Sequence, residues 1–589
     1  MSKQVDRVNS MTNGSGSGFE IEKSTLVRYH GQDALVIVPD GVTQVGPGAF
    51  EYCRSVERVT LPDSVRRVGS RAFHKCLGLE AVRLPETLDA LGDAAFSGCE
   101  RLRDADVPAG IAHIGEKAFY HCRKLTKVKL PEGLRSVGAR AFKACRSLKS
   151  VSLPDSVAVI GEEAFACCES LEALSLGNSV TSVGYRAFCA CEGLKAVSLP
   201  RGTALIGPEA FADCVSLVEF RAGDGLRSVG DRAFLRCGAL AEICLGGSAE
   251  ALGREVFRDC ARLEKADLPE TLREMGEGVF CGCGALSVIG IPRGLTAIPA
   301  RAFSGCKGLK LAALPDTVTE IGDGAFRACG LEEITIPDSV RDLGSEVFAY
   351  CRRLKKLLIP DSVGRLGGQM LGHCGSLVRV KLPAGISSVP PGMFESCSSL
   401  SRITIPQGVV CIGGTAFDNC RRLEEVSLPE GLETIGSHAF RFCESLRRIR
   451  LPDSVTEILQ AAFHYCVSLE NVSLPAGLEQ IGRFVFADCL KLRSIAIPDS
   501  VTAIGECAFM YSGLETIAIP DKVTAVGRDA FERCGRLERV YLPDSVTELA
   551  RGAFRECAEL RAVSLPGSLR NAAGEAFAGC GKASLRYRS

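Results

Sequence analysis

Cysteine is the residue type in this chain with the widest chemical capacity, because a thiolate is a nucleophile, a metal ligand and a redox group. The 589 residues include 29 cysteines, of which Cys167, Cys168, Cys189 and Cys191 lie close together in the sequence. A zinc or disulfide site is one hypothesis for these four, but their spacing is not that of a zinc ribbon. We expect no cofactor and no metal, with this four-cysteine cluster as an open alternative.

Histidine and the common catalytic motifs give no sign of an enzyme. The seven histidines do not fall at metal-binding or catalytic spacings. The chain has no His-Glu-x-x-His segment, no phosphate-binding Gly-Lys-Ser/Thr loop and no Gly-x-Ser-x-Gly segment. We therefore predict a non-catalytic protein. A redox-sensing or metal-sensing protein that uses the extra cysteines is a competing hypothesis.

The elements that position the cysteines belong to a repeat. A phenylalanine recurs every 23 residues from Phe50 to Phe326, and after a one-residue slip the series resumes at Phe348. Such a period identifies a stack of similar supersecondary units. A cysteine stands three residues after each repeat phenylalanine, and the exception is Ser512. Since these cysteines are placed by the repeat, we expect them to be small buried residues rather than disulfides.

One repeat shows how a turn of this stack is expected to fold. Residues Leu125–Leu130 alternate between apolar and polar side chains, which predicts a half-buried strand. Gly138 is expected to adopt a positive φ or to allow a close backbone approach. Ala141–Cys145 is expected to form a short 3₁₀ or helical turn on the convex side. Each unit is too small to fold alone, so its stability depends on stacking.

Two one-residue slips interrupt the period. They fall in the connection that precedes the predicted strand, at Cys329-Gly330-Leu331 and at Ser512-Gly513-Leu514. Glycine at both places is expected to let the backbone take the shorter path. The motif is intact on each side, so neither slip is expected to be a domain boundary.

The repeated pattern Leu-x-x-Val-x-Leu-Pro-Asp-Ser-Val-x-x-Ile-Gly-x-x-Ala-Phe-x-x-Cys resembles the BspA-like, or Treponema-type, leucine-rich repeat family. The resemblance covers roughly Val36 to Cys580, and Leu446–Phe463 is a near-consensus example. It implies a right-handed leucine-rich-repeat β-solenoid of about 24 repeats, with parallel strands on its concave face and short turns on its convex face. The expected domains are a disordered Gly/Ser-rich tail at 1–18, a capping hairpin and first turn at 19–49, the solenoid at 50–580, and a C-terminal cap or tail at 581–589.

Overall composition limits the partners and the location. Lys+Arg and Asp+Glu both number 70, so no net charge favours nucleic acid or an anionic membrane. No apolar stretch reaches the roughly 18 residues of a membrane span. Residues 1–18 contain no apolar segment typical of a secretory signal, which predicts a cytoplasmic protein. A cell-surface or secreted location is the alternative if the chain is a mature fragment.

The outward positions of the predicted strands are the candidate binding surface. In repeats 5 to 7 these positions carry small side chains such as Ser150 and Ala173, but two other regions are basic. The residues that we single out are Lys127, Lys129, Lys356, Arg379, Lys381, Arg402, Arg448 and Arg450. We predict a scaffold that binds a protein partner of unknown identity through this concave face. The resemblance also implies the alternative of a surface or secreted adhesin that binds host protein or glycan.

Overall fold

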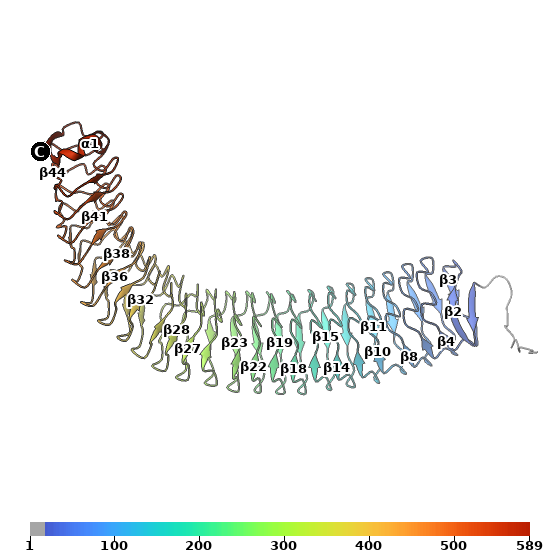
Figure 1. The fold of residues 1–589 in the computed structure, drawn as a ribbon. Helices are drawn as coiled ribbons and strands as arrows, with labels where there is room; N and C mark the ends of the chain where they lie inside the picture. The colour runs from blue at the N-terminus through green and yellow to red at the C-terminus, as the bar shows by residue number, and fades with distance from the viewer. Residues whose placement is uncertain (1–17, 589) are drawn as a thin grey trace, which may run out of the picture. The chain divides into compact units, whose positions relative to one another are not determined.

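The computed structural model describes residues 18–588, which separate into two compact units, 18–294 and 295–588. The chain winds through about 25 turns of parallel strands with little helix, and Figure 1 shows these turns stacked along each unit. The predicted leucine-rich-repeat solenoid is therefore confirmed. Residues 1–17 of the predicted tail lie outside the described residues. The predicted domain bounds, and the assignment of the strands to a concave face, stay predictions.

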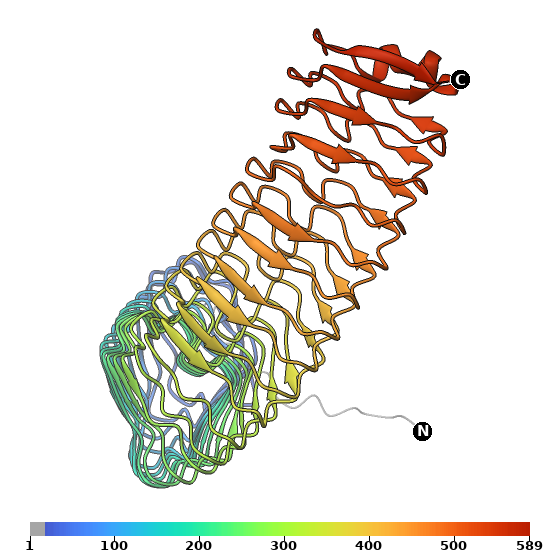
Figure 2. The same ribbon diagram turned by 90° about the vertical axis from the view of Figure 1, so that its left-hand side faces the viewer.

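Each regular turn contains two strands rather than one. The first is the predicted strand, as in β11 (Lys127–Lys129), and the second is a two-residue strand on the return path, as in β12 (Ser136–Val137). Along most of each unit, strands of each class pair in parallel with the same class in the next turn. We call the two classes the long strands and the short strands. Figure 2 shows them as two separate columns in the second unit.

The bounds of the strands in the first unit are as follows. The long strands are β3 (Leu35–Ile37), β5 (Arg58–Thr60), β7 (Ala81–Arg83), β9 (Asp104–Asp106), β11, β13 (Ser150–Ser152), β15 (Ala173–Ser175), β17 (Ala196–Ser198), β19 (Glu219–Arg221), β21 (Glu242–Cys244), β23 (Lys265–Asp267) and β25 (Val288–Ile289). The short strands are β4 (Gln44–Val45), β6 (Arg67–Val68), β8 (Ala90–Leu91), β10 (His113–Ile114), β12, β14 (Val159–Ile160), β16 (Ser182–Val183), β18 (Leu205–Ile206), β20 (Ser228–Val229), β22 (Ala251–Leu252) and β24 (Glu274–Met275). An antiparallel hairpin of β1 (Phe19–Glu22) and β2 (Thr25–Tyr29) precedes them, and β2 pairs with β4.

The second unit repeats this arrangement. Its long strands are β29 (Lys356–Leu358), β31 (Arg379–Lys381), β33 (Arg402–Thr404), β35 (Glu425–Ser427), β37 (Arg448–Arg450), β39 (Asn471–Ser473), β42 (Thr516–Ala518), β44 (Arg539–Tyr541), β46 (Ala562–Pro566) and β47 (Ser584–Arg588). Its short strands are β26 (Ala297–Ile298), β27 (Glu320–Ile321), β28 (Asp342–Leu343), β30 (Arg365–Leu366), β32 (Ser388–Val389), β34 (Cys411–Ile412), β36 (Thr434–Ile435), β38 (Glu457–Ile458), β40 (Gln480–Ile481), β41 (Ala503–Ile504), β43 (Ala525–Val526) and β45 (Glu548–Leu549). The helices among the described residues are the 3₁₀ helix η1 (Gly567–Leu569) and α1 (Arg570–Ala576).

The core of each unit is a column of stacked phenylalanine rings. Phe165 and Phe188 are fully buried, with ring centroids 5.3 Å apart and an interplanar angle of 1°. In the second unit, Phe440 and Phe463 stack in the same way at 5.4 Å and 2°. Leu371 occupies the same position in its turn and is also fully buried. The 23-residue period in the sequence therefore places one side chain of this column in each turn.

In the regular turns the segment around the repeat phenylalanine differs from the predicted 3₁₀ or helical turn, whereas at the last repeat η1 and α1 lead into Phe577. In the example repeat, Arg140 and Ala144 have φ values of 57° and 61°, in the left-handed region. The backbone N–H groups of Phe142 and Ala144 donate to carbonyls of the following turn, at 2.7 and 2.8 Å. A helix would use these donors within its own segment, so consecutive tight turns form instead.

The repeat glycine has the second of its two expected roles. Gly138 does not have a positive φ, but a Cβ on it would lie 2.7 Å from the carbonyl oxygen of Ile114 in the preceding turn. The backbones of successive turns therefore approach closely here, and a side chain would push them apart.

Both slips shorten the connection as expected. A Cβ on Gly330 would lie 2.1 Å from the oxygen of Lys307, and one on Gly513 would lie 2.1 Å from that of Leu490. The short strands stay paired across each slip, β27 with β28 and β41 with β43. The long-strand ladder has a gap at each slip, between β25 and β29 and between β39 and β42, and it has similar gaps away from the slips, as between β31 and β33. The isolated bridge between Ala313 and Thr335 still pairs long-strand positions across the first slip.

Candidate functional site

The periodic cysteines donate hydrogen bonds inside the core. The Sγ of Cys122 lies 3.2 Å from the carbonyl oxygen of Phe96, and that of Cys145 lies 3.2 Å from the carbonyl oxygen of Phe119. Each thiol thus reaches the phenylalanine of the preceding turn. Burial raises the pKa of the Cys122 and Cys145 thiols well above the usual value, and raises that of Cys351 to about 12. They are neutral donors at physiological pH, which the sequence did not reveal.

The four-cysteine cluster divides into two kinds of residue. Cys168 and Cys191 are buried and donate to phenylalanine carbonyls, both at 3.3 Å. Cys167 and Cys189 are half-buried neighbours in adjacent turns, since the N–H of Cys167 donates to the oxygen of Cys189 at 2.7 Å. Burial raises the pKa of Cys189 to about 11. Within residues 18–588, no group of three His, Cys, Asp or Glu side chains is arranged to hold a metal ion.

The structure places the predicted binding residues on the outward side of the long strands, and all are exposed. Lys127 and Lys129 lie on β11 in the first unit. Directly opposite them on β9 are Asp104 and Asp106. Opposite charges that face each other across a ladder are mutually stabilising, so this pair of lysines has compensating charge beside it.

The six remaining predicted residues lie in the second unit. Lys356 on β29 is paired with Arg379 on β31, and β31 lies against β33, which carries Arg402. Lys381 lies two residues after Arg379 on the same strand. We call Lys356, Arg379, Lys381 and Arg402 the basic strip. Arg448 and Arg450 follow on β37, beyond Glu425 on β35.

Acidic neighbours compensate only part of this charge. Lys381 Nζ lies 3.0 Å from Asp361, and Arg402 Nε lies 3.8 Å from Glu425. Arg450 lies 3.9 Å from Glu430. In the part of the chain that the structure describes, Lys356, Arg379 and Arg448 have no ion-pair partner.

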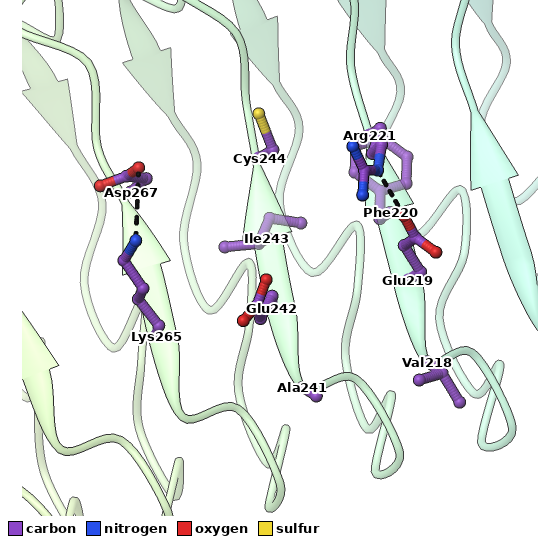
Figure 3. Close-up of a pocket in the computed structure, with 10 residues that line it drawn as sticks. All are labelled: Val218, Glu219, Phe220, Arg221, Ala241, Glu242, Ile243, Cys244, Lys265 and Asp267. Carbon is purple, nitrogen blue, oxygen red and sulfur yellow. Dashed lines mark hydrogen bonds and ion pairs between the residues drawn. The ribbon is translucent and has the colours of Figure 1, made fainter.

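The sequence prediction missed a second surface feature, on β19, β21 and β23. These strands line an open hollow of ≈ 430 Å³, shown in Figure 3. Glu219 pairs with Arg221 on one side, and Lys265 pairs with Asp267 at 3.8 Å on the other. The exposed thiol of Cys244 lies in register between Arg221 and Asp267. The alternation that marks the outward positions of these strands is the sequence signal that could have located this hollow.

Comparison with known proteins gives the following matches. The family described as BspA type Leucine rich repeat region matches residues 33–128, 112–240, 187–310, 227–355, 273–401, 387–515 and 479–588. No curated protein matches the chain. Among solved structures, the chain is similar to a leucine-rich repeat protein from Bacteroides ovatus, with 28% identity over 67% of this chain and 93% of that chain, at a TM-score of 0.49.

Two further solved structures are similar to this chain. The T. pallidum leucine-rich repeat protein has 27% identity over 43% of this chain and 91% of that chain, at a TM-score of 0.23. A leucine rich cell surface protein from Faecalibacterium prausnitzii has 20% identity over 75% of this chain and 95% of that chain, at a TM-score of 0.26.

Proposed function

Since this chain belongs to the BspA-type leucine-rich repeat family, we propose that it is a non-catalytic scaffold that binds an acidic protein surface. Repeat arrays of this kind typically present an extended surface to a partner. The observation that supports this function is the basic strip, in which four cationic side chains project from three successive long strands.

The positive charges of the basic strip repel one another when no partner is bound. Lys356 and Arg379 face each other across the β29–β31 ladder, and like charges in that position repel. An acidic partner surface would relieve this repulsion and gain ion pairs. The outward positions of these strands carry no aromatic side chain, so stacked nucleic acid bases would have no platform there.

Charge reversal tests this function. The full-length protein and an Arg379→Glu/Lys381→Glu variant would be used to capture partners from a lysate of the source organism. We expect the wild type to retain an acidic protein that the variant loses, with binding that weakens as salt rises. A Lys127→Glu/Lys129→Glu variant is the matched control and should retain the partner. Equal retention by the strip variant and the wild type would contradict the proposal.

The location of the protein affects which partners it meets. Among the described residues, no helix is long and apolar enough to cross a membrane. We propose the cytoplasm as its location, and a surface adhesin is the alternative function. Fractionation of the source cells separates the two, because an adhesin would appear on the outer surface or in the medium.

A further inference from the structure

A hollow lies beside the first slip on the surface of the second unit. The shortened connection at Gly330 lies close to the backbone of Lys307 in the preceding turn. The hollow beside it has a volume of ≈ 460 Å³. That volume falls within the range of small-ligand sites. The lining residues are Lys307, Arg327, Ala328, Cys329, Gly330, Tyr350, Arg352 and Arg353.

Four of these lining residues are cationic, and one of them is held in place. Arg327 lies 2.7 Å from Glu346, and its guanidinium lies over the ring of Tyr350 at 4.7 Å. Tyr350 in turn stacks on His373 of the following turn, with centroids 4.4 Å apart. The tyrosine ring therefore lies between two neighbours, and its faces are already covered.

The other three cations have no such partner. Within residues 18–588, the side chains of Lys307, Arg352 and Arg353 make no ion pair. All three are exposed at the rim of the hollow. Three uncompensated positive charges around one recess create a local positive potential that attracts anions.

The second slip shows that the fold does not require these cations. Its shortened connection at Gly513 makes the same close approach to the preceding turn. At the corresponding positions, 183 residues later in each case, Leu490 replaces Lys307 and Gly535 replaces Arg352. The one arginine retained, Arg536, lies 3.7 Å from Glu515. The same close approach is thus made without an unpaired cation at any of these three positions.

From this difference we infer that the hollow at the first slip binds the diphosphate group of a small molecule. Arginine matches phosphate oxygens in a bidentate manner, and lysine adds a point charge. A single phosphate carries about −1.5 to −2 charges at neutral pH, whereas three cations are free here. Two linked phosphates match that charge better. This site is separate from the basic strip and does not depend on the proposed function.

The covered ring of Tyr350 adds a specificity argument. A nucleotide base would need an open aromatic face on which to stack, but Arg327 and His373 already cover the faces of this ring. The site should therefore recognise the diphosphate itself. Free pyrophosphate and a nucleoside diphosphate should bind with affinities within about threefold of each other, which distinguishes the two sources of the group.

Isothermal titration of the full-length protein with inorganic pyrophosphate tests this site. We expect saturable binding at low ionic strength, and at least about tenfold weaker binding for Arg352→Gln/Arg353→Gln, since each lost charge-assisted hydrogen bond is worth about that much. Arg536→Gln at the second slip and Lys381→Gln in the basic strip should bind like the wild type. Unchanged thermal unfolding would show that the variants fold, as expected for exposed side chains.

Three results would overturn the inference. The first is no saturable binding of pyrophosphate to the wild type. The second is binding by Arg352→Gln/Arg353→Gln within about twofold of the wild type, and the third is an equal loss in Arg536→Gln, which would indicate non-specific attraction. A nucleoside diphosphate that binds much more tightly than pyrophosphate would refute the specificity argument.

Discussion

Substitution of Cys122 distinguishes a hydrogen-bond donor from a small apolar side chain. Its thiol is fully buried and lies 3.2 Å from the carbonyl oxygen of Phe96 in the preceding turn. The same oxygen accepts the backbone N–H of Cys99 at 3.1 Å, so both of its lone pairs are used. Serine preserves a donor at this position, whereas alanine removes it. The two variants therefore separate the two roles.

The expected magnitudes follow from this geometry. Cys122→Ala loses a hydrogen bond worth about 0.5–1.5 kcal/mol and the burial of one heavy atom, worth about 1 kcal/mol. Its total cost is about 2 kcal/mol. Cys122→Ser keeps the bond and should cost about 1 kcal/mol. If the thiol were only apolar, the order would reverse, because an unpaired buried hydroxyl costs about 1–3 kcal/mol.

Hydrogen exchange read by mass spectrometry is a suitable assay, because a repeat array does not unfold as a single two-state unit. The opening free energy of a peptide that spans residues 118–128 would be compared in the full-length wild type and both variants. Lower protection in Cys122→Ala than in Cys122→Ser would support the donor role. The opposite order would refute it.

Three other perturbations have definite expected outcomes. Phe257→Ala should lower the opening free energy of its turn by about 3–5 kcal/mol in the same exchange assay, because the ring is fully buried; exposed Lys265→Ala is the control, and an equal loss there would contradict the stacked core. Gly138→Ala should destabilise by about 1–3 kcal/mol in urea unfolding, since its Cβ would lie 2.7 Å from a carbonyl oxygen, whereas Gly247→Ala, with nothing within 4 Å, should not. Burial raises the pKa of Cys351 to about 12, so the stability that its neutral thiol gives the folded state is complete below the unfolded thiol pKa of ~8.5 and is lost as the pH rises toward the folded value. The thermal unfolding midpoint should therefore fall between pH 8 and 11. A constant midpoint would show that the buried thiols do not contribute.

The period and the alternation of side chains predicted much of the fold. The long strands, the phenylalanine column and the buried cysteines all follow from patterns that extend over one repeat. The short strands were missed because two residues, as in Ser136–Val137, are too few to show an alternation. The left-handed conformations of Arg140 and Ala144 were missed for another reason. Hydrogen bonds to the next turn stabilise them, and no local sequence signal marks that.

The candidate site was predictable to the extent that it depends on strand register. Knowing which positions point outward was enough to place Arg379 and Lys381 on the same surface. Register alone did not show that Asp361 pairs with Lys381 while Arg379 stays unpaired, because that depends on side-chain reach. The hollow at Gly330 was not predicted either, since it is lined by residues of three successive turns whose side-chain positions the repeat pattern does not give.

The position of the two slips indicates which interactions couple the turns. Phe326 donates its N–H to the following turn at 2.9 Å and accepts the thiol of Cys351 at 3.1 Å, across the first slip. The ring stack also continues there, from Phe326 to Phe348. The long-strand ladder is reduced there to the single bridge between Ala313 and Thr335. Turns therefore stay coupled through the phenylalanine segment and the short strands, and the long strands can vary in their outward side chains at little cost. A binding surface on the long-strand face is consistent with that division.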